Sequence, residues 1–282
     1  MTIDACSEQL IRMALEEDLG TGDVTTDSIV PEGHESSGVF IANQKGVVAG
    51  LEVAAMVFGE LARGVEMDVI VADGGEVGVG DRVAVVRGKT RAIVSGERVA
   101  LNFLQRLSGV ATATSELVAR LAGTKTRLLD TRKTTPGMRS LEKQAVVLGG
   151  GTNHRMGLWD MALIKDNHIA AAGGIGAAVA AVRERRPDVR IEVEVEDGSQ
   201  LEEALEAGVH RIMLDNMPPT EMERCIAAAR AHPSRPEIEI SGGVSAESLA
   251  GLAELGADFI SVGAITHSAP ALDITLELGG EE

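Results

Sequence analysis

Residues 191–196 read IEVEVE, and this short alternating run decides the fold class. Side chains of a strand point alternately to its two faces, so Glu192 and Glu194 share one face while the valines share the other. A doubly wound sheet is covered by helices on both faces and needs apolar residues on both. A barrel accepts inward-facing acids when its interior is a binding site. The stretch therefore predicts a barrel strand.

Predicted strands and helices alternate along the chain on both sides of this stretch. Strand-like runs recur at TRLLDT (126–131), MALIKD (161–166), RIMLD (211–215), EIEIS (237–241) and FISVG (259–263), with helical stretches such as SQLEEALEAG (199–208) between them. Six βα repeats imply parallel strands joined by right-handed crossovers. Because a closed barrel usually has eight strands, we predict an open, incomplete α/β barrel of six or seven strands.

The first hundred residues predict a smaller α+β sandwich-like domain. Apolar and polar residues alternate between glycine-rich turns in SSGVFIANQKGVVAG (36–50), VEMDVIVADGGEVGVGDRVAVVRG (65–88) and TRAIVSG (90–96), which indicates antiparallel strands. The run 96–123 predicts a long helix, with a place for a break at Ser108-Gly109. We expect this domain to cover 1–108 and to be joined by the C-terminal residues 269–282, with the barrel formed by 109–268.

The composition excludes several classes of partner. The chain of 282 residues is 44% hydrophobic and has a formal net charge of -17, which argues against nucleic acid and anionic membranes as partners. The N-terminus has acids where a signal peptide has bases, and no apolar run is as long as a membrane span. Cys6 and Cys225 form no CxxC pair, which indicates reduced thiols. We therefore expect a cytoplasmic protein.

Charged residues and glycines occur where the predicted strands end. In α/β barrels the C-terminal ends of the strands line the active site. These ends carry, in chain order, Arg132 and Lys133, Lys165 and Asp166, Glu194 and Glu196, Asp215 and Asn216, Ser241 to Gly243, and Val262 to Ala264. One such charge alone would suggest a solvated loop, but six matching strand ends indicate a site.

The window 125–165 is a basic island in an acidic chain. It holds eight Lys or Arg and three Asp or Glu, a local charge of +5 that leaves -22 for the remainder. Such an island at strand ends is typical of a pocket for a small anion. Within it, three glycines precede His154 and Arg155 and suggest a tight loop that returns these side chains to the rim near Lys165.

The last two strand ends predict a phosphate site, and two acids predict a metal site. ISGGV (240–244) and SVGAIT (261–266) place small residues where backbone N–H groups can approach an anion, with a helix start after each. Glu194 and Asp215 lie on neighbouring predicted strands, so their carboxylates can converge. Carboxylates together with substrate phosphates are the usual ligands of Mg²⁺, and no His/Cys cluster suggests zinc.

Long motifs along the chain resemble the quinolinate phosphoribosyltransferase family, type II phosphoribosyltransferases that are also called carboxylating nicotinate-nucleotide pyrophosphorylases. They cover most of the chain and are EEDLGTGDVTT (16–26), GERVALNFLQRLSG (96–109), DTRKTTPGMRSLEK (130–143), GGGTNHRMGLWDMALIKDNHI (149–169), IEVEVE, IMLDNM (212–217), EISGGV (239–244) and FISVGAITHSAPALDI (259–274). The resemblance implies the same two-domain fold in a homodimer, or a hexamer, whose active sites are shared between subunits.

The resemblance also assigns roles to residues. Arg98 would reach into the partner's site, and the substrate would be bound by Thr131, Arg132, Lys133, His154, Arg155 and Lys165. Phosphate would be contacted by Ser241, Gly242, Gly243, Val262, Gly263, Ala264 and His267. Catalytic roles fall to Lys133, Glu194 and Asp215, of which the two acids would hold Mg²⁺ and the ribose hydroxyls.

The implied reaction joins quinolinate to 5-phosphoribosyl 1-pyrophosphate with decarboxylation, giving nicotinate mononucleotide, pyrophosphate and CO2 in de novo NAD biosynthesis. Quinolinate is a dianion, which accounts for the crowd of cations. Three alternatives stay open. Lys165 could form a Schiff base, as in an aldolase. The chain could be a related phosphoribosyltransferase for a monocarboxylate, or a non-catalytic protein that binds a phosphosugar.

Overall fold

The computed structural model describes residues 3–279, and the chain divides into two compact units. The first unit holds Met1–Ser115, Lys133–Gly150 and Ala264–Glu282, and the barrel unit holds Glu116–Arg132 and Gly151–Gly263. The boundaries expected from the sequence, near 108 and 268, stay a prediction. Within residues 3–279, no helix has the length and apolar character needed to cross a membrane.

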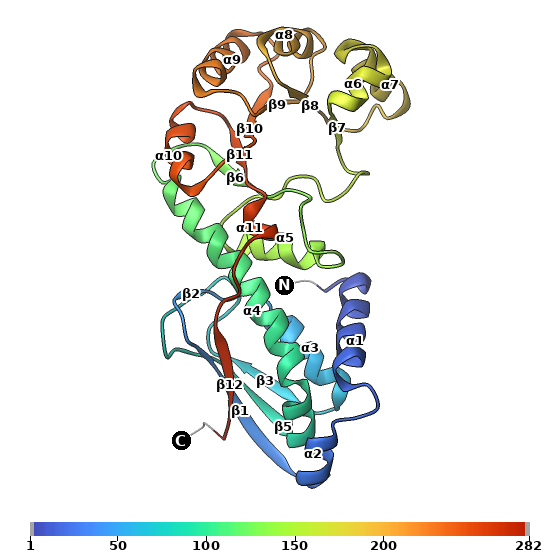
Figure 1. The fold of residues 1–282 in the computed structure, drawn as a ribbon, viewed down its shortest axis with the longest axis vertical. Coiled ribbons are helices and arrows are strands. Elements are labelled where there is room, and N and C mark those ends of the chain that lie inside the picture. The colour runs from blue at the N-terminus through green and yellow to red at the C-terminus, as the bar shows by residue number, and fades with distance from the viewer. Residues whose placement is uncertain (1–2, 280–282) are drawn as a thin grey trace. The chain divides into compact units, whose positions relative to one another are not determined.

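The barrel unit is built on a parallel sheet. Within residues 3–279 its six strands are β6 (Arg127–Leu129), β7 (Ala162–Ile164), β8 (Ile191–Val195), β9 (Arg211–Asp215), β10 (Glu237–Ser241) and β11 (Phe259–Ser261). Their order is β6-β11-β10-β9-β8-β7, so β6 and β7 are opposite edges of a sheet that does not close (Figure 1). The predictions of six parallel strands and of an open barrel are confirmed.

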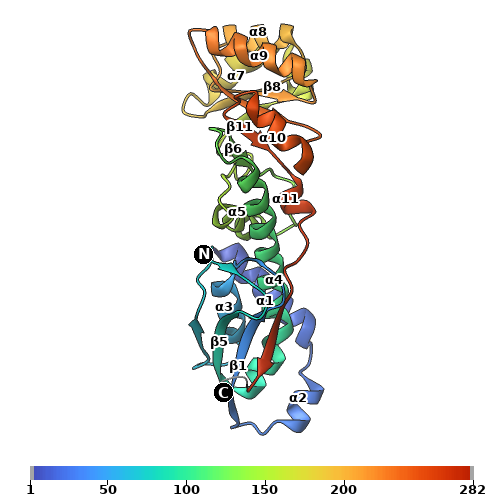
Figure 2. The same cartoon turned by 90° about the vertical axis from the view of Figure 1, so that its left-hand side faces the viewer.

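Helices cover the outer face of this sheet. They are α6 (Asp166–Ala172), α7 (Ile175–Arg185), α8 (Gly198–Glu206), α9 (Pro219–Ala231) and α10 (Ala246–Glu254). Figure 2 shows α7, α8 and α9 as a layer over the strands. Apolar side chains on the covered face, such as Val193, Ile212 and Ile238, are fully buried, which fixes the face that packs on the helices. The opposite face is free to carry charge.

The first unit contains an antiparallel sheet packed with helices. Its strands β12 (Ile274–Leu278), β1 (Glu35–Ala42), β5 (Arg82–Lys89) and β3 (Glu66–Val69) follow one another in that order, and β2 (Gly46–Val47) pairs with β4 (Glu76–Val77). Its helices include α1 (Ala5–Leu19), α2 (Val24–Ile29), α3 (Leu51–Leu61), α5 (Arg139–Leu148) and α11 (Ala264–His267). The C-terminal strand β12 pairs antiparallel with β1, and the expected extent of the N-terminal domain stays a prediction.

One helix corrects two expectations. Helix α4 (Thr90–Arg120) runs without a break through Ser108-Gly109, and it includes TRAIVSG (90–96), which the sequence suggested as a strand. Its glycines serve close packing. A Cβ on Gly109 would lie 2.0 Å from the Pro270 carbonyl oxygen, and one on Gly96 would lie 3.0 Å from the Phe58 ring. The short alternating pattern at 90–96 is therefore helical because neighbouring elements pack against it.

Candidate active site

The uncovered face of the barrel sheet carries the charged residues of the strands. Glu192 lies opposite Arg211 in the β8–β9 pairing, and Glu194 lies opposite Met213. Asp215 follows Met213 by two residues, so it shares this face with Glu194 and lies nearer the C-terminal edge. The structure thus places the two predicted metal ligands on one face of adjacent strands.

The deepest layer of this face is a cluster of arginine, phenylalanine and glutamate. The Arg211 guanidinium lies over the Phe259 ring at 4.2 Å, and that of Arg127 lies over the same ring at 4.5 Å. Arg211 also pairs with Glu237 at 3.0 Å and with Glu239 at 3.3 Å. Its side chain is only 10% exposed, so this cation neutralises acids inside the protein.

Above this layer the His154 ring lies between two buried carboxylates. Its Nε2 is 2.9 Å from Glu192 and 3.4 Å from Glu239, and both glutamate side chains are fully buried. The Nδ1 atom accepts the Arg155 backbone N–H at 2.7 Å, and the His154 backbone N–H donates to the buried Asp130 at 2.7 Å. His154 is therefore buried inside the barrel beside two carboxylates, and its predicted contact with substrate stays a prediction.

Burial and charge act in opposite directions on this cluster. Desolvation lowers the pKa of His154, but Glu192 and Glu239 outweigh it and raise that pKa to about 9. Desolvation and the charge of Glu239 raise the pKa of Glu192. For Glu239 desolvation is overcome by His154, Ser261 and Arg211, which keep its pKa below the ordinary value.

These three side chains also meet the geometric requirement for a metal centre. Among residues 3–279, one ligand atom from each of His154, Glu192 and Glu239 lies within 4.8 Å of the others. Arg211 already pairs with Glu239, however, and His154 Nδ1 already accepts a backbone N–H. These three side chains are distinct from the predicted magnesium pair, Glu194 and Asp215.

At the C-terminal edge the predicted site residues meet one another. Lys165 Nζ contacts the Glu194 carboxylate, and Asp215 accepts a hydrogen bond of 2.6 Å from the Asn216 side chain. Arg155 is half-buried and donates to the Met161 carbonyl at 3.2 Å. Burial and then the charge of the exposed Arg132 lower the pKa of Arg155. The two guanidinium groups thus repel each other, and a bound anion would relieve this repulsion.

The predicted phosphate loop has the backbone that its sequence requires. Gly242 and Gly243 have φ values of 92° and 59°, in the left-handed region that glycine tolerates. A Cβ on Gly242 would lie 2.2 Å from the Asn216 side-chain oxygen, so the loop after β10 packs directly against the loop after β9. Val262 is buried, and its N–H donates to the Leu129 carbonyl at 3.0 Å, which places Gly263 beside the end of β6.

Thr131 and Ser241 belong to the barrel unit, whereas Arg98, Lys133, Ala264 and His267 belong to the first unit. Arg98 is exposed on α4, and Lys133 and His267 are exposed at the start of the segment before α5 and at the end of α11. The Lys133 carbonyl accepts the Thr266 hydroxyl at 2.9 Å, and His267 Nδ1 lies 2.6 Å from the Ser268 hydroxyl. Ala264 begins α11 and is exposed.

Comparison with known proteins gives this arrangement a family. The N-terminal domain of quinolinate phosphoribosyl transferase matches residues 23–108, and its C-terminal domain matches residues 110–277. The chain belongs to the quinolinate phosphoribosyltransferase family. It is 42% identical to a probable nicotinate-nucleotide pyrophosphorylase (carboxylating) of Bacillus subtilis, over 96% of this chain and 93% of that protein. A Mycobacterium leprae protein named nicotinate-nucleotide pyrophosphorylase (carboxylating) is 41% identical, over 95% of each chain.

Solved structures agree with this family. The nicotinate-nucleotide pyrophosphorylase of Francisella tularensis superposes with a TM-score of 0.94 at 37% identity and covers 99% of this chain and 98% of its own. The human nicotinic acid phosphoribosyltransferase has a TM-score of 0.65 at 14% identity, over 98% of this chain and 74% of its own, which shows a shared fold only.

Within this member of the quinolinate phosphoribosyltransferase family, sequence reasoning missed several residues of the barrel interior. Asp130, Arg211 and Glu239 form hydrogen bonds or ion pairs in the barrel interior and were not predicted as site residues. Glu192 was predicted to face inward but was given no role. The alternation in EIEIS and IEVEVE carried the signal that these acids face inward. Their partners depend on strand register and could not be read from one strand alone.

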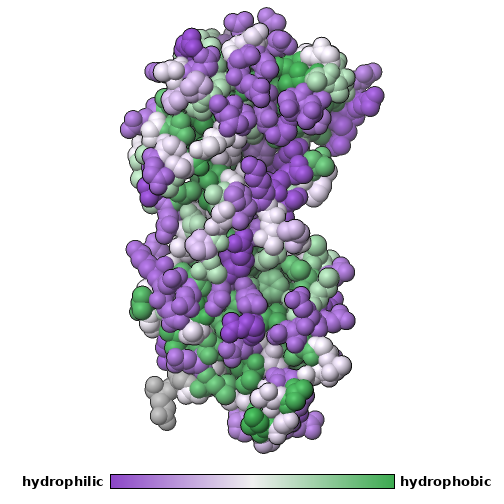
Figure 3. Space-filling model, in the orientation of Figure 1, coloured by the Kyte–Doolittle hydropathy of each residue, from purple (hydrophilic) through white to green (hydrophobic). Residues whose placement is uncertain are grey.

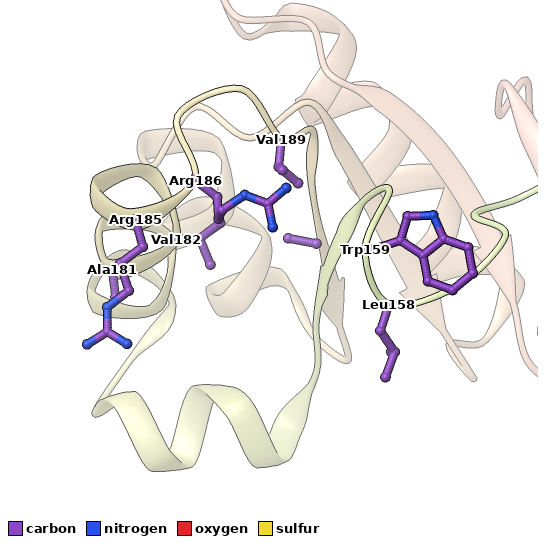
Figure 4. Close-up of a pocket in the computed structure, with 8 residues that line it drawn as sticks. Leu158, Trp159, Ala181, Val182, Arg185, Arg186 and Val189 are labelled. Carbon is purple, nitrogen blue, oxygen red and sulfur yellow. The ribbon is translucent and has the colours of Figure 1, made fainter.

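One cavity of about 320 Å³ lies outside this site. It is formed by the segment before β7 and by α7, and its walls are Leu158, Trp159, Ala162, Ala181, Val182, Arg185, Arg186 and Val189 (Figure 4). Trp159 and Leu158 are 66% and 72% exposed. None of the predicted site residues lines it. The surface of α7, α8 and α9 around it is mostly hydrophilic in Figure 3.

Proposed function

We propose that the chain transfers the phosphoribosyl group of 5-phosphoribosyl 1-pyrophosphate to quinolinate with decarboxylation, forming nicotinate mononucleotide, pyrophosphate and CO2 in de novo NAD biosynthesis. The observation that carries the proposal is the match of both family domains to residues 23–108 and 110–277, in a chain whose Arg132 and Arg155 repel each other electrostatically. Two such cations suit a dianion, because each can pair with one carboxylate.

Arg132 and Arg155, with Thr131, Lys133 and Lys165, bind the two carboxylates and orient the pyridine ring. His154 orders the same rim, since its ring accepts the Arg155 backbone N–H. The ring nitrogen then attacks the ribose C1 as the bond from C1 to the pyrophosphate oxygen breaks. The cationic ring accepts the electron pair of the breaking bond to the 2-carboxylate, CO2 leaves, and the ring carbon takes up a proton.

Glu194 and Asp215 stabilise the positive charge that develops on the ribose ring and bind its hydroxyls. They also fit Mg²⁺, because both are oxygen donors on one face of adjacent strands, although Lys165 already neutralises part of the Glu194 charge. Mg²⁺ held by these two carboxylates would neutralise charge on the leaving pyrophosphate.

The phosphate of the ribose is bound where the backbone carries few side chains. Ser241, Gly242 and Gly243 form one such segment, and the consecutive left-handed glycines leave their N–H groups uncovered by Cβ atoms. Val262, Gly263, Ala264 and His267 contribute the second segment.

We further propose a homodimer, or a hexamer built from such dimers, in which exposed Arg98 completes the partner's site. The cytoplasm is the proposed compartment, and Cys6 and Cys225 are free thiols in the described part of the chain.

The decisive experiment is an assay of nicotinate mononucleotide formation with 5-phosphoribosyl 1-pyrophosphate, Mg²⁺, and quinolinate and nicotinate in competition. We expect product and CO2 from quinolinate. Product formed equally well from nicotinate would replace the proposal with the monocarboxylate enzyme. Phosphosugar binding without turnover of either acid would leave a non-catalytic binding protein.

A further inference from the structure

Arg106, on the face of α4 that contacts α5 and α11, makes more polar contacts than the proposed mechanism requires. Its Nε and Nη2 donate to one oxygen of Glu142 at 3.0 and 2.7 Å, and Nη1 donates to the Ala269 carbonyl at 2.8 Å. Nη2 also contacts the Thr266 carbonyl. One guanidinium group thus joins three segments that are far apart in the sequence.

Glu142, on α5, is fully buried and accepts hydrogen bonds at both carboxylate oxygens. Besides Arg106, its carboxylate accepts the Thr135 backbone N–H at 3.0 Å and the Thr135 hydroxyl at 2.7 Å. Burial of a carboxylate is offset only by a cation together with further hydrogen bonds, and Glu142 has both. The pair is therefore a fixed point inside the first unit.

Two segments with proposed substrate contacts form hydrogen bonds with the Arg106–Glu142 pair. Thr135 binds Glu142 two residues after Lys133, and the Thr266 carbonyl accepts from Arg106 one residue before His267. The Thr266 hydroxyl also donates a hydrogen bond to the Lys133 carbonyl at 2.9 Å, which links the two segments to each other. The segment 133–138 is irregular and α11 has four residues, so neither can hold its own geometry through helical hydrogen bonds alone.

We propose that the Arg106–Glu142 pair is a positioning device for phosphoribosyl transfer, which sets Lys133 through Thr135 and Thr266 and sets His267 through the Thr266 carbonyl. Arg106 and Glu142 act through these neighbours and do not touch substrate. The inference rests on the proposed function for the roles of Lys133 and His267, while the contacts that define the device lie wholly within the first unit. Figures 1 and 2 show α5 and α11 beside α4.

The same helix supplies a matched control. Arg91 is also on α4, and its guanidinium likewise binds one carboxylate and two carbonyls: Asp27 Oδ1 at 3.0 Å, the Val30 carbonyl at 2.8 Å and the Asp27 carbonyl at 3.1 Å. It anchors α2 and the residues after it, which have no proposed substrate contact. Replacement by lysine removes the planar fork in both cases and keeps the charge.

The test compares three variants of the full chain, Arg106→Lys, Arg91→Lys and Thr266→Val, by thermal unfolding, by calorimetric binding of each substrate, and by steady-state kinetics. Arg106→Lys is expected to raise KM for both substrates and to lower kcat/KM by about 100-fold, the scale of a small misplacement of reacting groups. Arg91→Lys is expected to lose less thermal stability, because the Asp27 side chain is 56% exposed, and to keep unchanged KM values.

Thr266→Val distinguishes the positioning of Lys133 from the positioning of His267. It removes the hydrogen bond to the Lys133 carbonyl but keeps the Thr266 carbonyl that Arg106 binds. The KM for quinolinate should rise by up to about tenfold, the effect of one lost hydrogen bond, with the KM for 5-phosphoribosyl 1-pyrophosphate unchanged. A purely structural role would not produce this split.

Equal kinetic losses in Arg106→Lys and Arg91→Lys would overturn the inference, as would a folded Arg106→Lys variant with wild-type kinetics. A wild-type protein that binds both substrates without forming product would refute the proposed function alone, because the dissociation constants of the variants would still decide the positioning role. A wild type that binds neither substrate would refute both.

Discussion

Arg211 is the single residue on which the charged interior of the barrel depends most. It supplies a buried cation to Glu237 and Glu239 and stacks on Phe259, with 10% of its side chain exposed. Without it, the fully buried Glu239 loses its arginine partner. Removing one partner of a buried ion pair leaves an uncompensated charge, which is costly in a medium of low dielectric constant.

We predict that Arg211→Met lowers the free energy of unfolding by about 3–5 kcal/mol, measured by urea denaturation. Arg190→Met is the matched control, because Arg190 binds the same Glu237 at 2.8 Å with about half of its side chain exposed. Exposed pairs contribute roughly 0–1 kcal/mol, so this variant should unfold almost like the wild type. Similar losses in both variants would show that burial of the pair does not matter.

Arg132 carries the residue-level prediction for binding. Arg132→Ala should weaken quinolinate binding roughly 100-fold, since it removes charge-assisted hydrogen bonds to one carboxylate, and should leave binding of 5-phosphoribosyl 1-pyrophosphate nearly intact. Isothermal titration calorimetry with each ligand measures both effects. Arg224→Ala, which removes an exposed arginine on α9, serves as the control. Equal weakening of the two ligands would contradict the assignment.

At the scale of elements, close packing of α4 gives a prediction with an internal control. Gly109→Ala would bring a Cβ within 2.0 Å of the Pro270 carbonyl oxygen, so the helix and the segment before β12 must separate. We expect a loss of about 1–3 kcal/mol in the free energy of unfolding. Gly59 lies in α3, and a Cβ added there would meet no atom within 4 Å beyond its chain neighbours and its own helix backbone, so Gly59→Ala should instead stabilise by roughly 0.5–1 kcal/mol.

Helix α2 gives a prediction for acid pH. Asp23 caps it, accepting the N–H groups of Thr25 and Thr26, the Thr26 hydroxyl and the Ser95 hydroxyl, and these bonds lower its pKa from 3.8 to about 2. A lowered pKa means that the stabilisation is complete above pH 3.8 and disappears as pH falls through 2.

Asp23→Asn keeps a capping side chain that does not titrate. The variant should be less stable than the wild type at neutral pH and should approach it as the pH falls from about 4 to about 2. Unfolding curves across this range measure the convergence. A constant difference at every pH would show that the Asp23 charge contributes nothing.

The same scale shows why the elements were easier to predict than their contacts. Strands such as EIEIS alternate over enough residues to mark an inward face, and all six barrel strands were found. TRAIVSG is too short to separate a strand from a helix, and packing against Phe58 and Leu61 decides it. The Arg106–Glu142 pair joins α4 to α5 across 36 residues, so only the folded chain shows it.

At the scale of the whole molecule, the shared active site can be tested by mixing two inactive proteins. In the proposed dimer, Arg98 serves the partner's site while Arg132 serves its own, so Arg98→Ala and Arg132→Ala should each abolish turnover. In a refolded equal mixture, half of the dimers contain both variants. One site of each such mixed dimer then has both arginines intact, so the mixture should regain about a quarter of wild-type activity. Arg98→Ala mixed with itself provides the baseline. Activity that stays at this baseline would place Arg98 in the site of its own subunit.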